Sequence, residues 1–553
     1  MQTREVEQGL LDVLLRTAPD RPARVAHHMA NLHHDDTAVW ALRAAEQARV
    51  SFAWEQASRW FDVAVAHGHP PNDVDWLRAE LLGQSGRVAD ALVAWTAVAE
   101  TSTSKKQRVL ALGHGAALAY GTGDMAKGHS LAGPAVRALG MQLRPTMVGA
   151  FGQAAWWTVR RLLWSATGGK HQPDDAEAPL RLRLAWTIAG AMCSVDGIRG
   201  IGWLTRQRYE AERYGDAVDL ARGRAVALIL DASPGLAADE FDRRLDQMQV
   251  WRGQSTSALE RATYDMGSGY GAFASGETAH AHRLLSGSQM DFASSSYSGW
   301  ESRLVDKQLA WTAQYQGEFD RMSSLGDAVA TRCERVGNVV PELQMRLVTQ
   351  AYYSLVIDDV EAADREITEI QLRSGDSEAS GVRYFAHHAR ALERLYVGDS
   401  AGVPGVVRQM MGTSFRLETL LQARIASTMT LALAAAQQPD PKGLKRLQTL
   451  TRKLAKERSR WPLACASGLA GCVAWMQEDA AESERAYREA VSQFEAIGMG
   501  ALADSCRAHL GTLLGSQLPL LPLTQRGVVD PVRFLRMTMP GPASHAEFQG
   551  NPA

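Results

Sequence analysis

The sequence has few of the features that mark secreted, zinc-binding or membrane-spanning proteins. Five cysteines occur in 553 residues and no two form a Cys-x-x-Cys pair, which excludes a disulfide framework and a thiolate zinc knuckle. The most apolar stretch, Thr146 to Ala166, is interrupted by Arg160 and Arg161 and falls short of the roughly 18 uncharged residues of a membrane span. The amino end lacks the unbroken apolar core of a secretion signal. We therefore expect a cytoplasmic protein without a membrane span.

Signatures of nucleotide-binding and hydrolytic enzymes are also missing. A phosphate-binding loop needs G-x-x-x-x-G-K-[ST], and the nearest string, Gly168-Gly169-Lys170-His171, lacks the earlier glycine and the final hydroxyl residue. The kinase signatures H-R-D and D-F-G and the nucleophile elbow G-x-S-x-G do not occur. The sequence thus predicts a protein that is not an enzyme, with no catalytic residue and no cofactor.

An excess of charge of one sign is lacking as well. The chain has 59 Lys and Arg against 61 Asp and Glu, so its net charge of -2 does not favour nucleic acid or an anionic surface as a global partner. With 46% hydrophobic and 22% charged residues, the composition is that of a folded protein. At about 150 residues per domain, the length predicts several domains or one long repeat array.

The sequence does contain a repeating helical pattern. Apolar residues recur at helical spacing almost throughout, and no long alternating run predicts a strand. Turn residues recur at one or two periods of about 40 residues. They are Gly86, Gly123, Gly197, Gly276, Gly317, Asp358, Gly398 and Glu478. The pattern predicts an all-α superhelical solenoid of antiparallel helix hairpins, with about 40 residues per repeat and twelve to fourteen hairpins.

Small residues predict where the paired helices cross, since thin side chains let two backbones approach to about 8 to 10 Å. The residues seven positions before the turns are Ala79, Ala116, Gly190, Gly269, Ala310, Ala351, Ala391 and Gly471. The residues five positions after them are Ala91, Gly128, Gly202, Ala281, Met322, Ala363, Val403 and Ser483. Two interpolated turns, near 235 and 438, fit poorly because the residues seven positions before them are the large Leu228 and Leu431. Larger residues such as Trp95, Leu285 and Tyr487 are expected to fill the grooves between hairpins.

An acidic residue directly follows six of the turns. These residues are Asp124, Glu277, Glu318, Asp359, Asp399 and Asp479. A carboxylate at this position accepts hydrogen bonds from the free backbone N–H groups of a helix start, so we expect helix caps. A row of acids that recruits a basic partner is the functional alternative.

The repeat register divides the chain into four parts. We expect repeats over residues 1–140, a Trp- and Arg-rich helix and loop over 141–179, continuing repeats over 180–540, and a disordered tail over 541–553. The insertion and Arg137 just before it form the only local concentration of basic and aromatic residues: Arg137, Arg144, Trp156, Trp157, Arg160, Arg161, Trp164 and Lys170. It is interpreted as a helix that packs its Trp residues between repeats while Arg faces water. Contact with nucleic acid or a membrane interface is the alternative.

No set of residues predicts a metal site. The cluster His27, His28, His33, His34, Asp35 and Asp36 lacks the i, i+4 histidine spacing of a helical zinc site. His387 and His388 are interpreted as structural, and Cys465 and Cys472 as small core residues. Neither a metal ion nor another cofactor is expected.

Three stretches resemble a known arrangement. AHHMANLHHDDTAVWALRAAEQARVSFAWEQASRWFDVAV near the amino end and FAHHARALERLYVGD and YREAVSQFEAIGM further on are similar to the tetratricopeptide-like helical region of bacterial signalling proteins with a serine/threonine kinase or STAND-type ATPase domain. The closing stretch GVVDPVRFLRMTMPG is similar to the pattern that ends this region, with Asp530 in place of Asn. The enzymatic domains of that family are absent here, so the resemblance implies its sensor or scaffold part.

The expected function is that of a scaffold. We hypothesise that the concave face of the array binds a protein or peptide and thereby regulates a signalling kinase or ATPase. The alternative is a nucleic-acid-contacting regulator of the LuxR-activator type, which uses the segment around Trp156.

Overall fold

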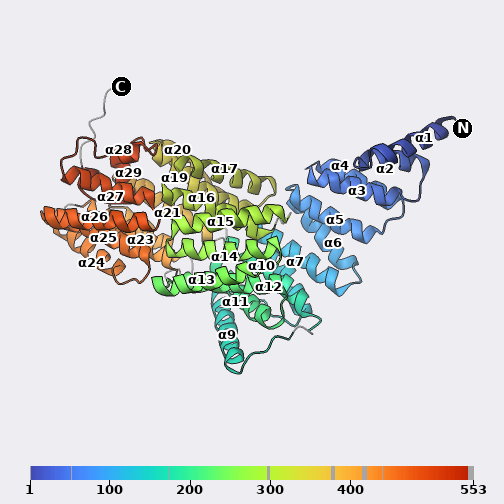
Figure 1. Ribbon diagram of the computed structural model, residues 1–553, viewed down its shortest axis with the longest axis horizontal. Coiled ribbons are helices and arrows are strands. Elements are labelled where there is room, and N and C mark those ends of the chain that lie inside the picture. The colour runs from blue at the N-terminus through green and yellow to red at the C-terminus, as the bar shows by residue number, and fades with distance from the viewer. Residues whose placement is uncertain are drawn as a thin grey trace. The chain divides into compact units, whose positions relative to one another are not determined.

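The computed structural model describes residues 2–51, 53–172, 175–295, 299–374, 380–413, 420–438 and 440–545. The described residues form helices joined by short connections and contain no strand (Figure 1). The all-α prediction is therefore confirmed. The chain divides into two compact units: unit 1 comprises Met1–Leu143 and Cys333–Asn338, and unit 2 comprises Arg144–Arg332 and Val339–Ala553.

Unit 1 is a stack of helix pairs in which consecutive helices contact each other. Its helices are α1 (Gln2–Thr17), α2 (Pro22–Leu32), α3 (Thr37–Val50), α4 (Trp54–Ala66), α5 (Pro71–Gln84), α6 (Val88–Thr101), α7 (Lys105–Gly121) and α8 (Met125–Ala138). Trp95 of α6 fills the groove between pairs as expected, because its ring lies 4.8 Å from Trp76 of α5 and 5.1 Å from His114 of α7.

Unit 2 is built in the same way. Its helices are α9 (Met147–Ala166), α10 (Ala178–Val195), α11 (Gly197–Tyr214), α12 (Ala217–Ala232), α13 (Ala238–Gly253), α14 (Ala258–Ser275), α15 (Thr278–Ser294), α16 (Trp300–Gln316), α17 (Phe319–Arg335), α18 (Val339–Met345), η1 (Arg346–Gln350), α19 (Ala351–Val356), α20 (Val360–Ser374), α21 (Ser380–Val397), α22 (Val403–Gly412), α23 (Leu421–Ala436), α24 (Pro441–Leu454), α25 (Arg460–Met476), α26 (Ala480–Ala496), α27 (Gly500–Leu513), α28 (Leu521–Thr524), α29 (Pro531–Thr538) and η3 (Pro542–His545). The last three residues of α17, 333–335, belong to unit 1. The π-helical segment η1 joins α18 and α19 into one continuous helix.

The predicted turns are present. Seven of the eight turn residues have a positive φ, as a tight helix-to-helix turn requires. They are Gly86, Gly123, Gly276, Gly317, Asp358, Gly398 and Glu478. Gly197 is the exception, because it begins α11 and the connection from α10 is the single residue Asp196. Asp196 caps α11 by accepting a hydrogen bond of 3.1 Å from the backbone N–H of Arg199.

Several of the predicted small residues lie where paired helices touch. Gly190 of α10 and Gly202 of α11 do not, because they face Trp300 of α16 and Ala150 of α9. A Cβ atom on Gly269 of α14 would lie 2.7 Å from Leu285 Cγ of α15, and one on Gly471 of α25 would lie 2.9 Å from the Tyr487 ring of α26. In the second pair, Ser483 Oγ also donates a 2.8 Å hydrogen bond to the carbonyl oxygen of Gly471. The predicted alanines Ala79, Ala116, Ala310, Ala351 and Ala391 are at most 1% exposed. A bulkier side chain at these positions would push the pairs apart.

The poor fit near residue 235 has a structural reason. Gly235 does adopt the left-handed conformation of a turn, but α12 makes its main contact with α14 rather than with the next helix, α13. Leu228 of α12 packs against Gly271 of α14, where a Cβ atom would lie 2.9 Å from Leu228 Cγ. The thin residue of this crossing therefore lies on α14.

Four of the six predicted acidic caps form. Asp124, Asp359, Asp399 and Asp479 accept hydrogen bonds from the backbone N–H groups of Lys127, Ala362, Gly402 and Glu482. Glu277 makes no cap hydrogen bond; its carboxylate accepts a 2.6 Å bond from Arg460. Glu318 accepts one of 2.8 Å from Arg321. The longer glutamate side chain thus pairs with arginine where aspartate bonds to the backbone.

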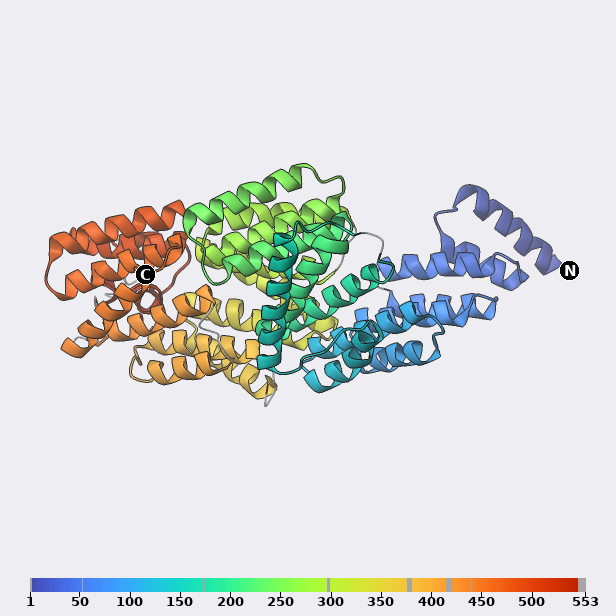
Figure 2. The same ribbon diagram turned by 90° about the horizontal axis from the view of Figure 1, so that it is seen from below.

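Successive turns of the array contact each other in unit 2. Arg460 at the start of α25 donates 2.6 Å hydrogen bonds both to Asp242 of α13 and to Glu277 before α15. The backbone N–H of Leu421 bonds to the carbonyl of Ser233 at 2.7 Å, and that of Thr278 to Ile497 at 2.8 Å. The green and the yellow to orange helices consequently lie side by side (Figure 2).

The carboxyl end is ordered further than expected. Residues 541–545, part of the tail for which the composition predicts disorder, are placed against the core, with Pro542–His545 forming η3. Tyr487 Oη donates a 2.8 Å hydrogen bond to the carbonyl of Pro540, and Ala543 is 1% exposed. The remaining tail residues, 546–553, lie outside the described residues.

In the part of the chain that the structure describes, no helix combines the length and apolar character that a membrane crossing requires.

Candidate functional site

Contacts between helices that are distant in sequence define an inner layer of unit 2. Helix α10 contacts α16, α18 and α21, and α14 contacts α16 and α23. We call α10, α14, α16, α18, α21 and α23 the inner helices. Helices such as α13, α15, α20 and α24 contact chiefly their neighbours in sequence and form the outer layer.

An aromatic cluster connects three inner helices. The rings of Phe273 (α14) and Trp311 (α16) stack with centroids 5.6 Å apart, and Trp311 lies 5.5 Å from Phe385 of α21. Tyr315 packs edge-on against Trp461 of α25 at 5.4 Å. The inner aromatic cluster consists of Phe273, Trp311, Tyr315, Tyr384, Phe385 and Trp461. Four of its members, Trp311, Tyr315, Tyr384 and Phe385, are only half-buried.

Protein surrounds these half-buried side chains closely. Burial raises the pKa of Tyr315 and of Tyr384 above the ordinary tyrosine value, and it lowers the pKa of His388, which stacks on Tyr384, to about 4. All three side chains are therefore neutral at pH 7. The cluster offers aromatic surface in a poorly hydrated setting.

Lys307 supplies a positive charge at the edge of the cluster. Its Nζ lies 4.9 Å from the Trp311 ring centroid and donates a 2.9 Å hydrogen bond to Gln344 of α18. The cation is thus held over an aromatic face by an electrostatic attraction that poor hydration strengthens. The position of Lys307 beside Trp311 combines a charge with an apolar surface.

Several buried polar atoms near the inner helices have no hydrogen-bond partner among the described residues. Trp311 Nε1 is one, and Ser268 Oγ of α14 and Gln308 Oε1 of α16 are others. An unsatisfied buried group costs about 1 to 3 kcal/mol. The Trp311 N–H is the donor that belongs to the cluster itself.

The buried carboxylate of Glu301 in the inner layer already has hydrogen-bond donors. Glu301 of α16 is fully buried, and its Oε1 accepts hydrogen bonds of 2.6 Å from Trp186 Nε1 and 2.9 Å from Arg222. This carboxylate therefore ties α10 and α12 to α16. Its contacts indicate a structural function.

The histidines and cysteines of the sequence analysis do not assemble into a metal site. His28 contacts Glu7, His33 ends α2, and the ring of His34 accepts a 3.1 Å bond from the backbone of Asp36. Among the described residues, no three potential ligands gather within reach of one ion. Cys465 and Cys472 lie at buried positions of α25, and this burial raises the pKa of both thiols to about 12.

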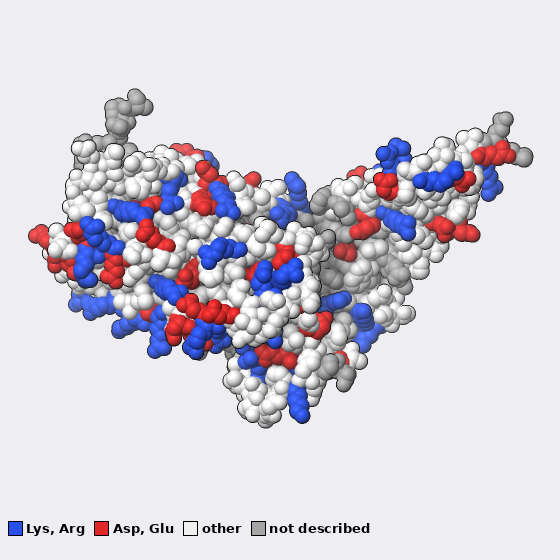
Figure 3. Space-filling model, in the orientation of Figure 1, with Lys and Arg blue, Asp and Glu red and all other residues white. Residues whose placement is uncertain are grey.

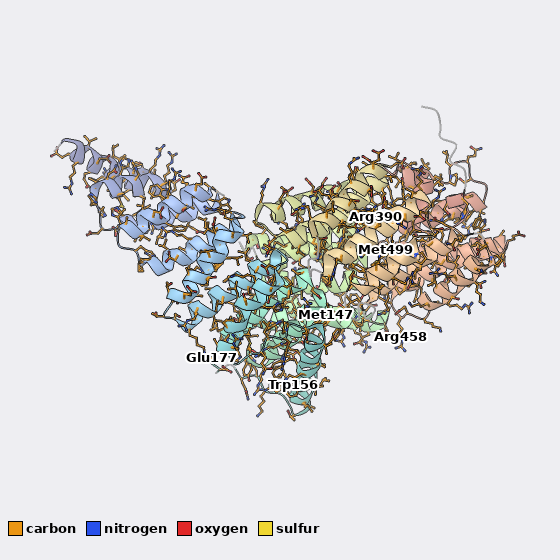
Figure 4. All side chains as sticks on the ribbon, turned by 180° about the vertical axis from the view of Figure 1, so that it is seen from behind. Met147, Trp156, Glu177, Arg390, Arg458 and Met499 are labelled. Carbon is orange, nitrogen blue, oxygen red and sulfur yellow. The ribbon has the colours of Figure 1, made fainter. Side chains whose placement is uncertain are left out.

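The Trp- and Arg-rich segment forms α9, which packs against α11. Trp157 is buried as expected, with its ring 5.4 Å from Tyr209. Trp156, however, is 60% exposed, which corrects the expectation that the Trp residues pack between repeats while Arg faces water. Arg161 pairs with Glu212 at 2.7 Å, and Arg160 lies over the Trp157 ring. Figure 4 places Trp156 at the lower edge of unit 2.

The sequence analysis missed the inner aromatic cluster. Of its members, Trp311 alone directly follows a predicted small residue, Ala310. The aromatic residues in the same position of the neighbouring repeats, Tyr270 and Tyr352, do not belong to the cluster, and Tyr352 packs with Phe319 and Phe534 instead. Phe385 and Tyr384 occupy other positions, so no common position of the repeat predicts the cluster.

The comparisons with known proteins assign this chain to no family. No protein-family model matches, and no curated protein matches. Among solved structures, the chain is similar to yeast Tom70, with 12% identity, a TM-score of 0.33, and coverage of 89% of this chain and 99% of that one. It is also similar to the APC/C hetero-tetramer Cut9-Hcn1, with 11% identity, a TM-score of 0.34, and coverage of 89% and 93%. Because both TM-scores are low, the fold assignment rests on the helices described above and not on these similarities.

Proposed function

We propose that this chain is a non-enzymatic helical-repeat scaffold that binds a protein or peptide on the inner face of unit 2. The observation that carries the proposal is the inner aromatic cluster, in which four of the six rings stay half-buried between tightly packed helices. Partly exposed aromatic side chains are typical anchors of protein recognition.

The chemistry of the cluster defines the expected ligand. Trp311 and Phe385 present apolar ring surface, and Trp311 Nε1 is a donor without a partner among the described residues. Lys307 adds a positive charge beside them. We therefore propose a peptide segment with an apolar or aromatic side chain for the rings and an acidic residue for Lys307.

The biological setting of the proposal comes from the sequence resemblance. We propose a cytoplasmic scaffold that binds its partner in order to regulate a signalling kinase or STAND-type ATPase. Purified chain mixed with such an enzyme should change the rate of phosphoryl transfer or ATP hydrolysis, while the chain alone should hydrolyse no ATP. Turnover of ATP by the purified chain would contradict the non-enzymatic function.

A peptide array tests the binding proposal. The full chain is applied to the array, and the affinity of the selected peptides is then measured by fluorescence polarisation. Trp311→Ala should weaken binding by tenfold or more, as expected for an aromatic anchor worth about 2 kcal/mol. Trp156→Ala is the matched control, because Trp156 is exposed on α9 and distant from the inner helices in sequence. Equal affinities of the two variants would contradict the proposal.

The nucleic-acid alternative is tested separately. Arg161 is paired with Glu212, so this guanidinium already has an anionic partner. A regulator that contacts phosphates through α9 would bind DNA or RNA with an affinity that falls steeply with salt. Negligible binding at all salt concentrations would remove this alternative.

A further inference from the structure

Helix α9 packs on α11 along one side and presents an apolar strip on the other. The large side chains of the strip are between 51% and 72% exposed. At about 100° per residue, its members fall within an arc about 120° wide. The α9 strip consists of Val148, Gly152, Ala155, Trp156, Val159, Leu162, Leu163 and Ala166. No polar side chain interrupts this arc.

The charges next to the α9 strip have one sign. From residue 144 to residue 172 the chain contains basic residues and no acidic residue. Arg160 borders the strip, and Lys170 is exposed just beyond the carboxyl end of α9. Arg161 lies on the side that packs and is paired with Glu212. Figure 3 shows a largely uncharged surface over α9.

The area of the strip disfavours a second copy of the chain as its partner. A helix of 20 residues is about 30 Å long and about 10 Å wide, so one face offers roughly 300 Å². A stable dimer buries about 800 Å² on each partner. Two copies would also bring together helices that carry only basic charges. A bilayer has no such area requirement, and its anionic headgroups match the charge.

We propose that α9 is a membrane-surface anchor that lies in the interface of a bilayer containing anionic lipid. The α9 strip inserts into the boundary between headgroups and acyl chains, with Trp156 at the headgroup level, where its amphipathic ring is favoured. Arg160 and Lys170 contact the lipid phosphates. The helix lies parallel to the membrane surface and does not cross it. The scaffold would thereby be recruited to a membrane.

Vesicle sedimentation with the full chain tests this proposal. The probes are vesicles of phosphatidylcholine alone and of equal parts phosphatidylcholine and phosphatidylglycerol. The full chain should sediment with the anionic vesicles. The triple variant Trp156→Ser, Leu162→Ser, Leu163→Ser should reduce the partition coefficient about a hundredfold or more, because three inserted side chains are lost.

A matched control uses exposed apolar residues elsewhere in unit 2. Val250, Met290 and Leu372 are 53%, 69% and 78% exposed on the outer helices α13, α15 and α20. The triple variant with serine at these three positions should sediment like the unaltered chain. In a separate variant, Lys170→Gln should weaken binding to the anionic vesicles about fivefold and leave the low binding to neutral vesicles unchanged.

Two results would overturn the proposal. One is sedimentation of the α9 variant equal to that of the unaltered chain. The other is absence of vesicle binding together with self-association that the α9 variant abolishes in sedimentation velocity, which would make a second copy the partner.

Discussion

Helices α13 and α14 are neighbours in sequence but differ sharply in composition and burial. Helix α13 buries only one narrow stripe, made of Phe241, Leu245 and Met248. Helix α14 is buried on nearly all sides, and Gly267, Gly269 and Gly271 bring it close to helices on both flanks. An inner helix of this array therefore needs thin residues on several faces, while an outer helix needs one apolar stripe. The predictions below test this difference between inner and outer positions.

The largest difference is expected for buried charge. Glu301→Ala should lower the free energy of unfolding by about 3 kcal/mol, because it removes the buried carboxylate of the inner helix α16 that binds Trp186 of α10 and Arg222 of α12. Glu482→Ala, which breaks the exposed pair with Arg485 on α26, should change it by less than about 1 kcal/mol. Urea-induced unfolding measures both. Equal losses would show that the inner layer is not distinct.

Glycine positions provide the next test. A Cβ atom at Gly267 would lie 2.6 Å from the Cα of Ala225 on α12, so Gly267→Ala should destabilise the protein by about 1 to 3 kcal/mol. Nothing lies within 4 Å of the same position at Gly152 on the exposed side of α9. Gly152→Ala should stabilise α9 by up to about 1 kcal/mol through helix propensity. Thermal unfolding compares the two, and destabilisation by both variants would contradict the account.

A buried histidine makes the stability of the folded chain depend on pH. Burial lowers the pKa of His509 to about 4, and its Nδ1 accepts a 3.2 Å bond from the backbone of Ala543. The unfolded chain takes up this proton near pH 6.5, whereas the folded chain does so only near pH 4. Stability is therefore lost as the pH falls from about 6.5 towards 4.

Between pH 7.5 and 5.0, His509 should contribute a loss of about 2 kcal/mol to the free energy of unfolding. His509→Gln should lose correspondingly less over the same interval. Urea titrations at the two pH values measure this, and an identical pH dependence of the two proteins would exclude His509 as the cause.

The smallest effect is expected for a single hydrogen bond across a crossing. Ser483→Ala removes the bond to the carbonyl of Gly471 and should cost about 1 kcal/mol, since this oxygen is then left without that donor between α25 and α26. Ser324→Ala on the exposed side of α17 is the control and should be close to neutral. Destabilisation by Ser324→Ala as large as that by Ser483→Ala would contradict the expected difference between a buried and an exposed hydrogen bond.

Local features of the fold were predictable from the sequence, and long-range contacts were not. A turn such as Gly276 is identified by the conformational freedom of glycine, and the crossing residues follow from their constant distance to the turns. The contact of Arg460 with Asp242 joins residues 218 positions apart and depends on how tightly the array winds. No local pattern contains that information.

The candidate site was predictable only in part, for the same reason. Trp311 directly follows the predicted crossing residue Ala310, but its partner Phe385 belongs to a distant helix. The two faces of α9 likewise depend on the position of α11. The adjacent residues Trp156 and Trp157 have opposite environments, because one faces away from α11 and the other packs against its Tyr209.

The central claim is that the half-buried rings between the inner helices form the binding face. Hydroxyl-radical footprinting of the full chain, with and without a peptide selected on the array, tests it most directly. Bound peptide should reduce the oxidation of Trp311, Tyr384 and Phe385 and leave that of the exposed Trp156 unchanged. Unchanged oxidation of the three inner residues while the peptide is bound would contradict the claim.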